Sequence, residues 1–195
     1  MTDWAGRYRD QDTPWDLGRA HPELLRRLVA GELAPFDGGR ALVAGCGRGY
    51  DALALAEAGW QVTAVDLVPL ETPSLRKLEE LGGCFEVRDA LAFRAEESFD
   101  LVFDHTFFCA IQPQERASFG EMVRSVTGPG SVVVSLVFPF DKPLEDGGPP
   151  FGFQAADLQE ALGASFRSEV DELVIEGVSR RTWKERWSRW VRDDA

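Results

Sequence analysis

The chain has 195 residues, with 33 Asp and Glu against 21 Lys and Arg, which gives a formal net charge of −12. Its length and its hydrophobic content of 44% predict one domain, residues 1–195, with a buried core. An acidic excess of this size repels phosphate backbones, so nucleic-acid binding is excluded as an expected function.

The predicted elements alternate between strands and helices after two N-terminal helices, which we expect at residues 3–9 and 21–30. Short β-branched or aliphatic runs predict buried strands at residues 41–44, 61–66, 84–87, 99–104 and 131–138. Helix formers between these runs predict helices at residues 51–58, 74–81, 113–126 and 155–162. This alternation indicates an α/β fold with a doubly wound, mostly parallel sheet.

The alternation stops after Gly163. Residues 166–170 and 173–178 are too close for a crossover helix, so we expect an antiparallel pair and a sheet that ends in a reversed strand. Trp183, Trp187 and Trp190 are spaced by four and three, which predicts a C-terminal helix with an aromatic face. The arginines and lysine around them are expected to face the acidic body of the protein.

The cysteines and the apolar runs exclude several other classes. Cys46, Cys84 and Cys109 form no Cys-x-x-Cys pair, so we expect neither a disulfide framework nor a metal site. The first residues lack the layout of a signal peptide, and no apolar run reaches the roughly 20 residues of a membrane-spanning helix. We therefore expect a cytoplasmic protein that does not bind membranes.

A glycine-rich loop follows the first predicted strand, at Gly45, Gly47 and Gly49. Glycines at this place let the backbone approach a ligand at a helix N-terminus. Asp66 ends the second strand, where its carboxylate can accept both hydroxyls of a ribose. Tyr50 replaces the small residue of the dinucleotide pattern, which favours S-adenosylmethionine; a nicotinamide site and a plain strand–helix turn remain as alternatives.

Two further strand ends carry candidate residues. Asp89, followed by Ala90, ends the third strand, where a carboxylate or a backbone amide can bind an adenine; a solvated carboxylate is the alternative. Asp104 and His105 end the fourth strand, which we expect beside the first, at the point where ligands of such sheets bind.

Several motifs, taken together, resemble the thiopurine S-methyltransferase family, which includes thiol and halide methyltransferases. They are Trp4-x-x-x-Tyr8, residues 13–18 (Thr-Pro-Trp-Asp-x-Gly), residues 44–51, residues 99–110 and residues 148–151. The resemblance implies a class I methyltransferase with a seven-stranded, Rossmann-like core at residues 40–195 and a helical cap at residues 1–39. It also implies S-adenosylmethionine as methyl donor and S-adenosylhomocysteine as product.

The same resemblance implies a small, soft methyl acceptor, such as a thiopurine, another thiol, hydrosulfide or a halide. Tellurium or selenium compounds are alternative acceptors. A non-catalytic S-adenosylmethionine-binding protein and a nicotinamide-dependent oxidoreductase are alternative functions. Related sequences have arginine or tyrosine where His105 stands, which leaves the acceptor open. We expect a monomer, with a dimer as the alternative.

The site residues carry over by position, with the N-terminal aromatic residues over the cofactor, Gly45 at its methionine portion, Asp66 on the ribose and Asp89 near the adenine. The expected cofactor contacts are Trp4, Tyr8, Trp15, Gly45, Gly47, Gly49, Asp66, Leu67, Asp89, Ala90 and Asp104. The physical case for the aromatic residues is that a sulfonium is a cation, which an aromatic face attracts. Core packing is the alternative for the tryptophans.

A thiol acceptor has to lose its proton, because the thiolate is the nucleophile. We expect the catalytic residues to be His105, which can take this proton, and Asp104, which can receive it from the imidazole. In the alternative, both residues only bind the cofactor or orient each other. Phe107, Phe108 and Phe151 are expected to form an apolar acceptor pocket, with core packing as the alternative.

Overall fold

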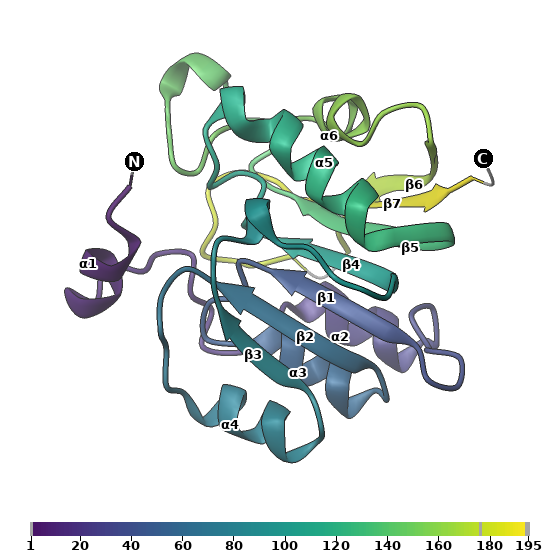
Figure 1. The fold of residues 1–195 in the computed structure, drawn as a ribbon. Coiled ribbons are helices and arrows are strands. Elements are labelled where there is room, and N and C mark those ends of the chain that lie inside the picture. The colour runs from purple at the N-terminus through teal and green to yellow at the C-terminus, as the bar shows by residue number, and fades with distance from the viewer. Residues whose placement is uncertain (1, 176, 194–195) are drawn as a thin grey trace.

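The computed structural model describes residues 2–175 and 177–193 and contains one seven-stranded sheet (Figure 1). The strand order is β3-β2-β1-β4-β5-β7-β6, and β7 runs antiparallel to both of its neighbours while the other pairs are parallel. The strands are β1 (Arg40–Ala44), β2 (Gln61–Asp66), β3 (Cys84–Val87), β4 (Phe99–His105), β5 (Thr127–Val137), β6 (Phe166–Leu173) and β7 (Arg186–Arg192). The predicted α/β class, with one reversed strand, is confirmed.

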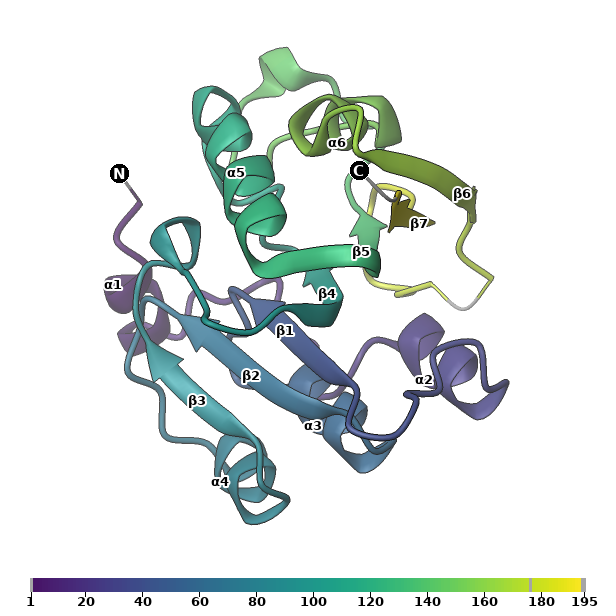
Figure 2. The same ribbon diagram turned by 45° about the vertical axis from the view of Figure 1, so that its right-hand side comes forward.

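Helices cover both faces of the sheet (Figure 2). One face packs against α2 (Pro22–Val29), α3 (Tyr50–Glu57) and α4 (Pro73–Glu80). The other packs against α5 (Arg116–Val126), α6 (Ala155–Leu162) and the 3-10 helix η1 (Ala90–Ala92). In β1, Val43 belongs to the first core and Leu42 to the second, which is why the strand is apolar throughout.

The N-terminal segment divides into two parts with different positions. Leu24 of α2 is fully buried in the core between the sheet and the helices α2, α3 and α4. By contrast, α1 (Trp4–Arg9) lies off the edge at which the parallel strands end, so it is α1 and the residues after it that reach the site (Figures 1 and 2). Pro22 and Pro73 each stand at the first turn of their helix, where a missing N–H costs nothing.

Up to residue 162, the predicted strands and helices are confirmed with small shifts at their ends. The segment after β4 begins with the 3-10 turn η2 (Pro113–Glu115) before α5, and η3 (Leu144–Asp146) lies in the loop after β5. No helix among the described residues is both long and apolar enough to span a lipid bilayer.

The predicted C-terminal elements are wrong in two respects. Residues 166–173 form the single strand β6, with a bulge between Ser168 and Val170, and the second strand expected at 173–178 is absent from its described residues; Glu176 lies outside them. The expected C-terminal helix is the strand β7. In β7 the side chains of Trp187 and Trp190 enter opposite cores, so both faces of this strand are covered. Burial on both faces removes the alternation typical of a strand, and the remaining spacing imitates a helix.

Candidate active site

A cavity of about 840 Å³ opens at the edge where the parallel strands end. Its lining combines four parts of the chain: the N-terminal segment, the ends of β1, β2, β3 and β4 with the residues that follow them, the loop after β5, and the segment before β7. Among the described residues no group of three or more His, Cys, Asp or Glu side chains is arranged to hold a metal ion. In this cavity the strand-end residues meet residues from the far end of the chain.

The glycine loop and Asp66 form one end of the cavity. The Asp66 carboxylate accepts hydrogen bonds from the backbone N–H of Gly47 (2.8 Å) and of Val68 (3.0 Å), one on each oxygen. Burial raises the pKa of Asp66, against the lowering effect of these N–H groups. Each carboxylate oxygen keeps a lone pair for a further donor, which suits a pair of vicinal hydroxyls.

Gly45 brings the backbone directly against a cavity-lining ring. Its φ is +61°, and a Cβ built on it would stand 2.4 Å from Cδ2 of Phe107. Only glycine fits both the backbone angle and this approach. Gly49, also expected in the site, does not line the cavity; it has a φ of +81° and starts α3, beneath Leu75.

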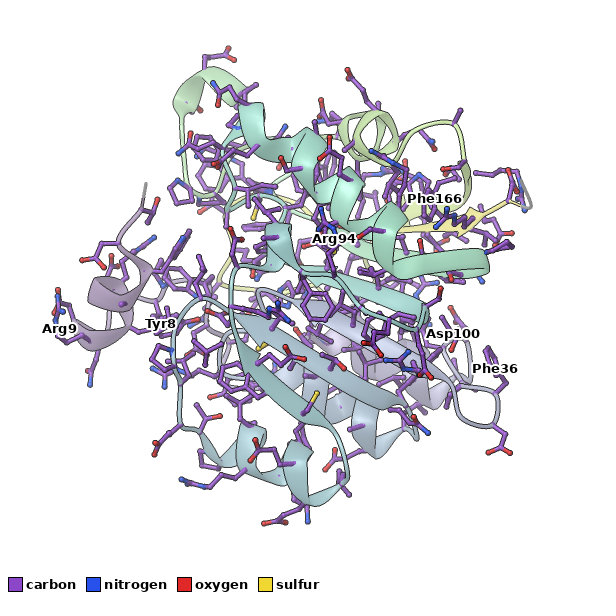
Figure 3. The ribbon with its side chains drawn as sticks, in the orientation of Figure 1. Tyr8, Arg9, Phe36, Arg94, Asp100 and Phe166 are labelled. Atoms are coloured by element: carbon purple, nitrogen blue, oxygen red, sulfur yellow. The ribbon has the colours of Figure 1, made fainter. Side chains whose placement is uncertain are left out.

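Three aromatic side chains from the N-terminal segment cover this end. Trp15 makes edge-to-face contacts with Trp4 and Tyr8, at centroid distances of 5.4 and 5.7 Å, and its indole N–H donates to the Tyr8 hydroxyl at 3.4 Å. Tyr8 points from α1 toward the sheet, whereas Arg9 points away from it (Figure 3). Burial raises the pKa of Tyr8 to about 12, so its hydroxyl keeps its proton.

The aromatic cover is fastened to the glycine loop by charge. Arg48 Nε lies 2.5 Å from Asp16 Oδ2, and the Arg180 guanidinium donates to the Asp16 backbone carbonyl. The Arg7 guanidinium lies 4.4 Å from the Trp15 ring centroid, so a cation already occupies one face of that ring. The sequence indicated the aromatic residues but not these arginines.

The end of β3 contributes Asp89 and Ala90, and the end of β2 contributes Leu67, to the same lining. Asp89 is exposed and accepts a hydrogen bond from the backbone N–H of Leu91 at 2.9 Å, which caps η1. One carboxylate oxygen of Asp89 therefore accepts a local hydrogen bond, and among the described residues none donates to the other.

Asp104 does not line the cavity, although its neighbour His105 does. Asp104 is buried, and its carboxylate accepts hydrogen bonds from the N–H groups of Phe107 (3.1 Å) and Phe108 (3.0 Å) and from the Ser135 hydroxyl (2.6 Å). Burial raises its pKa. These bonds hold the tight turn after β4, in which Thr106 adopts a φ of +65°.

The His105 ring lies between a carboxylate and a guanidinium. Its Nδ1 is 2.6 Å from Asp51 Oδ2, and its Nε2 is 2.9 Å from Arg181 Nη2. Burial works to raise the pKa of Asp51, but the His105 ring and the His21 backbone N–H outweigh burial and lower it. The Asp51 carboxylate is thus charged at neutral pH, and the imidazole is held at both nitrogens.

The acceptor candidates differ in position. Phe107 lines the cavity. Phe108 instead packs in the core on Phe119 and Phe153, and Phe151 is buried with its N–H on the Cys109 carbonyl; neither lines the cavity. In their place, the apolar wall is formed by Phe138, Pro149, Pro150 and Trp183.

Sequence reasoning missed Asp51, Arg181, Glu185 and His21, which surround His105. Asp51 stands in the quoted glycine motif, so its place after the loop was an available signal. The sequence places Arg181 only among the basic residues of the terminal segment, with Glu185 as the one acid between Arg180 and Arg192. No pattern in the sequence relates His21 to Glu185, which are 164 residues apart.

Comparisons with known proteins agree with this geometry. The family model described as thiopurine S-methyltransferase (TPMT) matches residues 1–190. The chain belongs to this family. It is 32% identical, over 195 residues, to "probable thiol methyltransferase 2" of Arabidopsis thaliana, a match that covers 96% of the chain and 83% of that relative. "Thiocyanate methyltransferase 1" of the same plant is also 32% identical, with the same coverage.

Solved structures show the same fold. The 1,6-didemethyltoxoflavin-N1-methyltransferase of Burkholderia thailandensis, determined with bound 1,6-didemethyltoxoflavin and S-adenosylhomocysteine, superposes with a TM-score of 0.78. It is 24% identical, and the match covers 98% of the chain and 86% of that structure. The expectations of the family and of the class I methyltransferase fold are confirmed.

Proposed function

We propose that the protein transfers a methyl group from S-adenosylmethionine to the sulfur of a small, soft nucleophile. The observation that carries the proposal is that one cavity is lined by Asp66 and the glycine loop and also by His105 and Arg181, with Phe107 packed against Gly45. When bound, S-adenosylmethionine supplies an activated methyl group that a nucleophile displaces in line.

The residues present fit this cofactor. Asp66 has a free lone pair on each oxygen for the ribose hydroxyls, and its other partners are backbone N–H groups that hold the carboxylate still. Gly45 and Gly47 leave room where a Cβ would meet Phe107 or the Tyr8 hydroxyl, at 2.4 and 2.9 Å. Leu67, Asp89 and Ala90 would hold the adenine, and Trp4, Tyr8 and Trp15 would cover the cofactor and exclude water.

The acceptor end suits a small, polarisable anion. Phe138, Pro149, Pro150 and Trp183 supply apolar contact, and the Arg181 guanidinium lies 4.2 Å from the Phe138 ring centroid, which adds a fixed positive charge. Such an end fits a thiolate, hydrosulfide or thiocyanate better than a hydrated hard anion. The names of the plant relatives support the same sulfur chemistry.

In this proposal His105 lines the acceptor end and Asp104 supports the turn that aims it. Phe107 is the aromatic contact between the two ends, while Gly49, Phe108 and Phe151 support the site from outside the cavity. A cytoplasmic location and a monomeric state remain part of the proposal.

The proposal is tested with the purified protein and separate additions of S-adenosylmethionine, S-adenosylhomocysteine and NADH. We expect the first two ligands, and not NADH, to raise the melting temperature. We also expect S-adenosylhomocysteine to form when hydrosulfide, thiocyanate or an aromatic thiol is added. A melting-temperature rise with NADH alone would favour an oxidoreductase. Binding of S-adenosylmethionine without product from sulfur, selenium, tellurium or halide acceptors would favour a non-catalytic binding protein.

A further inference from the structure

Five residues join in a closed hydrogen-bonded circuit behind the acceptor end of the cavity; we call His21, Asp51, His105, Arg181 and Glu185 the polar ring. His21 Nε2 lies 3.3 Å from both Glu185 carboxylate oxygens, and Glu185 accepts from the Arg181 guanidinium. Arg181 contacts His105, His105 contacts Asp51, and the Asp51 carboxylate accepts the His21 backbone N–H at 2.8 Å. Four separate chain segments meet in this ring.

The contacts determine where each proton lies. His21 Nδ1 accepts the N–H of Glu23 at 3.1 Å, so Nε2 carries the proton and donates to Glu185. Arginine has no acceptor, so His105 Nε2 must offer its lone pair to Arg181, and Nδ1 carries the proton toward Asp51. Both imidazoles are therefore neutral, with opposite tautomers, and the Arg181 guanidinium lies between the Glu185 carboxylate and the His105 ring.

Access to solvent divides the polar ring into two parts. Asp51, His105 and Arg181 line the cavity, whereas His21 and Glu185 do not. The side chains of His21 and Glu185 are 0% and 4% exposed. Burial works to raise the pKa of Glu185, but the His21 hydrogen bond and the Arg181 charge lower it to about 2. Glu185 is thus a permanent charge whose fixed partner is the cavity-lining arginine.

We propose that Glu185 and His21 are positioning residues that hold Arg181 on His105 Nε2, so that the site selects acceptors that arrive already ionised. The proposal rests on the proposed function and names the acceptor class within it. With its Nε2 lone pair on Arg181, His105 does not take a proton from the acceptor; a thiol loses its proton to solvent before it binds. The fixed guanidinium then attracts the resulting anion.

Histidine tautomers test the polar ring without any acceptor. The chain has two histidines, so ¹⁵N NMR of the imidazoles gives two pairs of ring-nitrogen signals, and His21→Gln leaves only the pair of His105. We expect Nδ1–H for His105 and Nε2–H for His21 at neutral pH. An Nε2–H tautomer at His105 would overturn the arrangement, even if the protein turned out to methylate nothing.

Binding of a matched pair of small molecules tests the selection of anions. The probes are thiocyanate and its neutral methyl ester, methyl thiocyanate, added to the S-adenosylhomocysteine complex at constant ionic strength. We expect Glu185→Gln to weaken thiocyanate binding about tenfold or more, because Arg181 loses the ion pair that holds its guanidinium at the acceptor end, and to leave methyl thiocyanate within about twofold. Equal effects on both probes, or none on either, would overturn the proposal.

Steady-state kinetics with thiocyanate as methyl acceptor distinguish a positioning role of Glu185 from a role in stability alone. The negative charge disappears as the anion meets the methyl group, so we expect Glu185→Gln to raise KM about tenfold for thiocyanate while kcat stays within about twofold. Glu169→Gln is the matched control, because it removes a carboxylate from the exposed ion pair with Arg189 of β7. It should change neither constant.

Two further variants keep the test decisive if Glu185→Gln does not fold. Glu185→Asp keeps the charge but shortens its reach, and we expect a smaller rise in KM for thiocyanate. His21→Gln retains one donor toward Glu185 and should give a rise smaller than about threefold. A lower melting temperature with wild-type KM in both variants would mean a structural role only, and would contradict the proposal.

Discussion

The two ends of the cavity are assembled in different ways. Beneath its N-terminal aromatic cover, the cofactor end is built from residues 45–90, where successive parallel strands deliver a glycine loop, Asp66 and Asp89 to one edge. The acceptor end is built from the end of β4, the loop after β5 and the segment before β7, with Asp51 of α3 and, behind the lining, His21 at the start of α2. The first end is local in sequence and held largely by backbone N–H groups; the second depends on side-chain contacts across up to 164 residues.

This difference explains what the sequence predicted. A strand followed by a glycine loop and an acidic residue at the end of the next strand is a local pattern, so Gly45 and Asp66 were found from spacing. Even at such a strand end, however, the sequence did not show which side chain faces the cavity. Asp104 and His105 are neighbours at the end of one strand, and alternation sends one into the interior and the other to the cavity. Periodicity alone could not choose between them.

The acceptor end could not be predicted from the sequence, because which residues reach it depends on the position of β7 in the sheet. Trp187 and Trp190 imitate a helical face since β7 is covered on both sides. Because residues 186–192 form a strand, Arg181 lies beside the end of β4 and Glu185 beside the start of α2. In the strand itself, Arg186 pairs with Asp171 and Arg189 with Glu169, both of β6. The basic terminal segment is therefore divided between the cavity and a sheet edge.

The largest expected effect concerns the close approach at the cofactor end. Gly45→Ala places a Cβ 2.4 Å from the Phe107 ring at a φ of +61°. We expect the free energy of unfolding to fall by about 1–3 kcal/mol in chemical denaturation, because neither the backbone angle nor the contact is tolerated. Adding Phe107→Ala should restore part of the loss. Equal stability of wild type and Gly45→Ala would show that this approach is not required.

The next effect tests the backbone-held carboxylate. Asp66→Ala should weaken binding of S-adenosylhomocysteine tenfold or more in isothermal titration, equivalent to about 1.4 kcal/mol. Asp89→Asn is the control, since Asp89 is exposed and keeps its bond to Leu91 through the amide oxygen. We expect a smaller loss there. Unchanged affinity in Asp66→Ala would remove Asp66 from the cofactor site.

At the acceptor end, the buried His21 predicts that the free energy of unfolding depends on pH. Burial lowers the pKa of His21, with Glu185 opposing, so the unfolded chain binds a proton below pH ~6.5 that the folded chain does not. The contribution of neutral His21 to stability is present above that pH and is lost as pH falls toward the folded pKa. Denaturation of His21→Gln should show a shallower decline between pH 7 and 5. Parallel curves for the two proteins would contradict this.

The smallest effect concerns the fastening between the aromatic cover and the glycine loop. Arg48 and Asp16 form a partly exposed ion pair, for which a contribution of about 0.2–1 kcal/mol is expected. Asp16→Asn should therefore weaken binding of S-adenosylhomocysteine by about twofold to fivefold, and less in high salt. Asp12→Asn, which affects the exposed pair with Arg7, is the matched control. A salt-independent loss would assign Asp16 another role.

The joint action of the two ends is tested most directly by following a labelled methyl group. S-adenosylmethionine carrying a ¹³C methyl is incubated with the protein and thiocyanate, which has a soft sulfur and a harder nitrogen, and the product is identified by ¹³C NMR. We predict methyl thiocyanate, with the label on sulfur, and one S-adenosylhomocysteine for each product molecule. Label on nitrogen, or no labelled product although S-adenosylmethionine binds, would contradict methyl transfer to sulfur in this cavity.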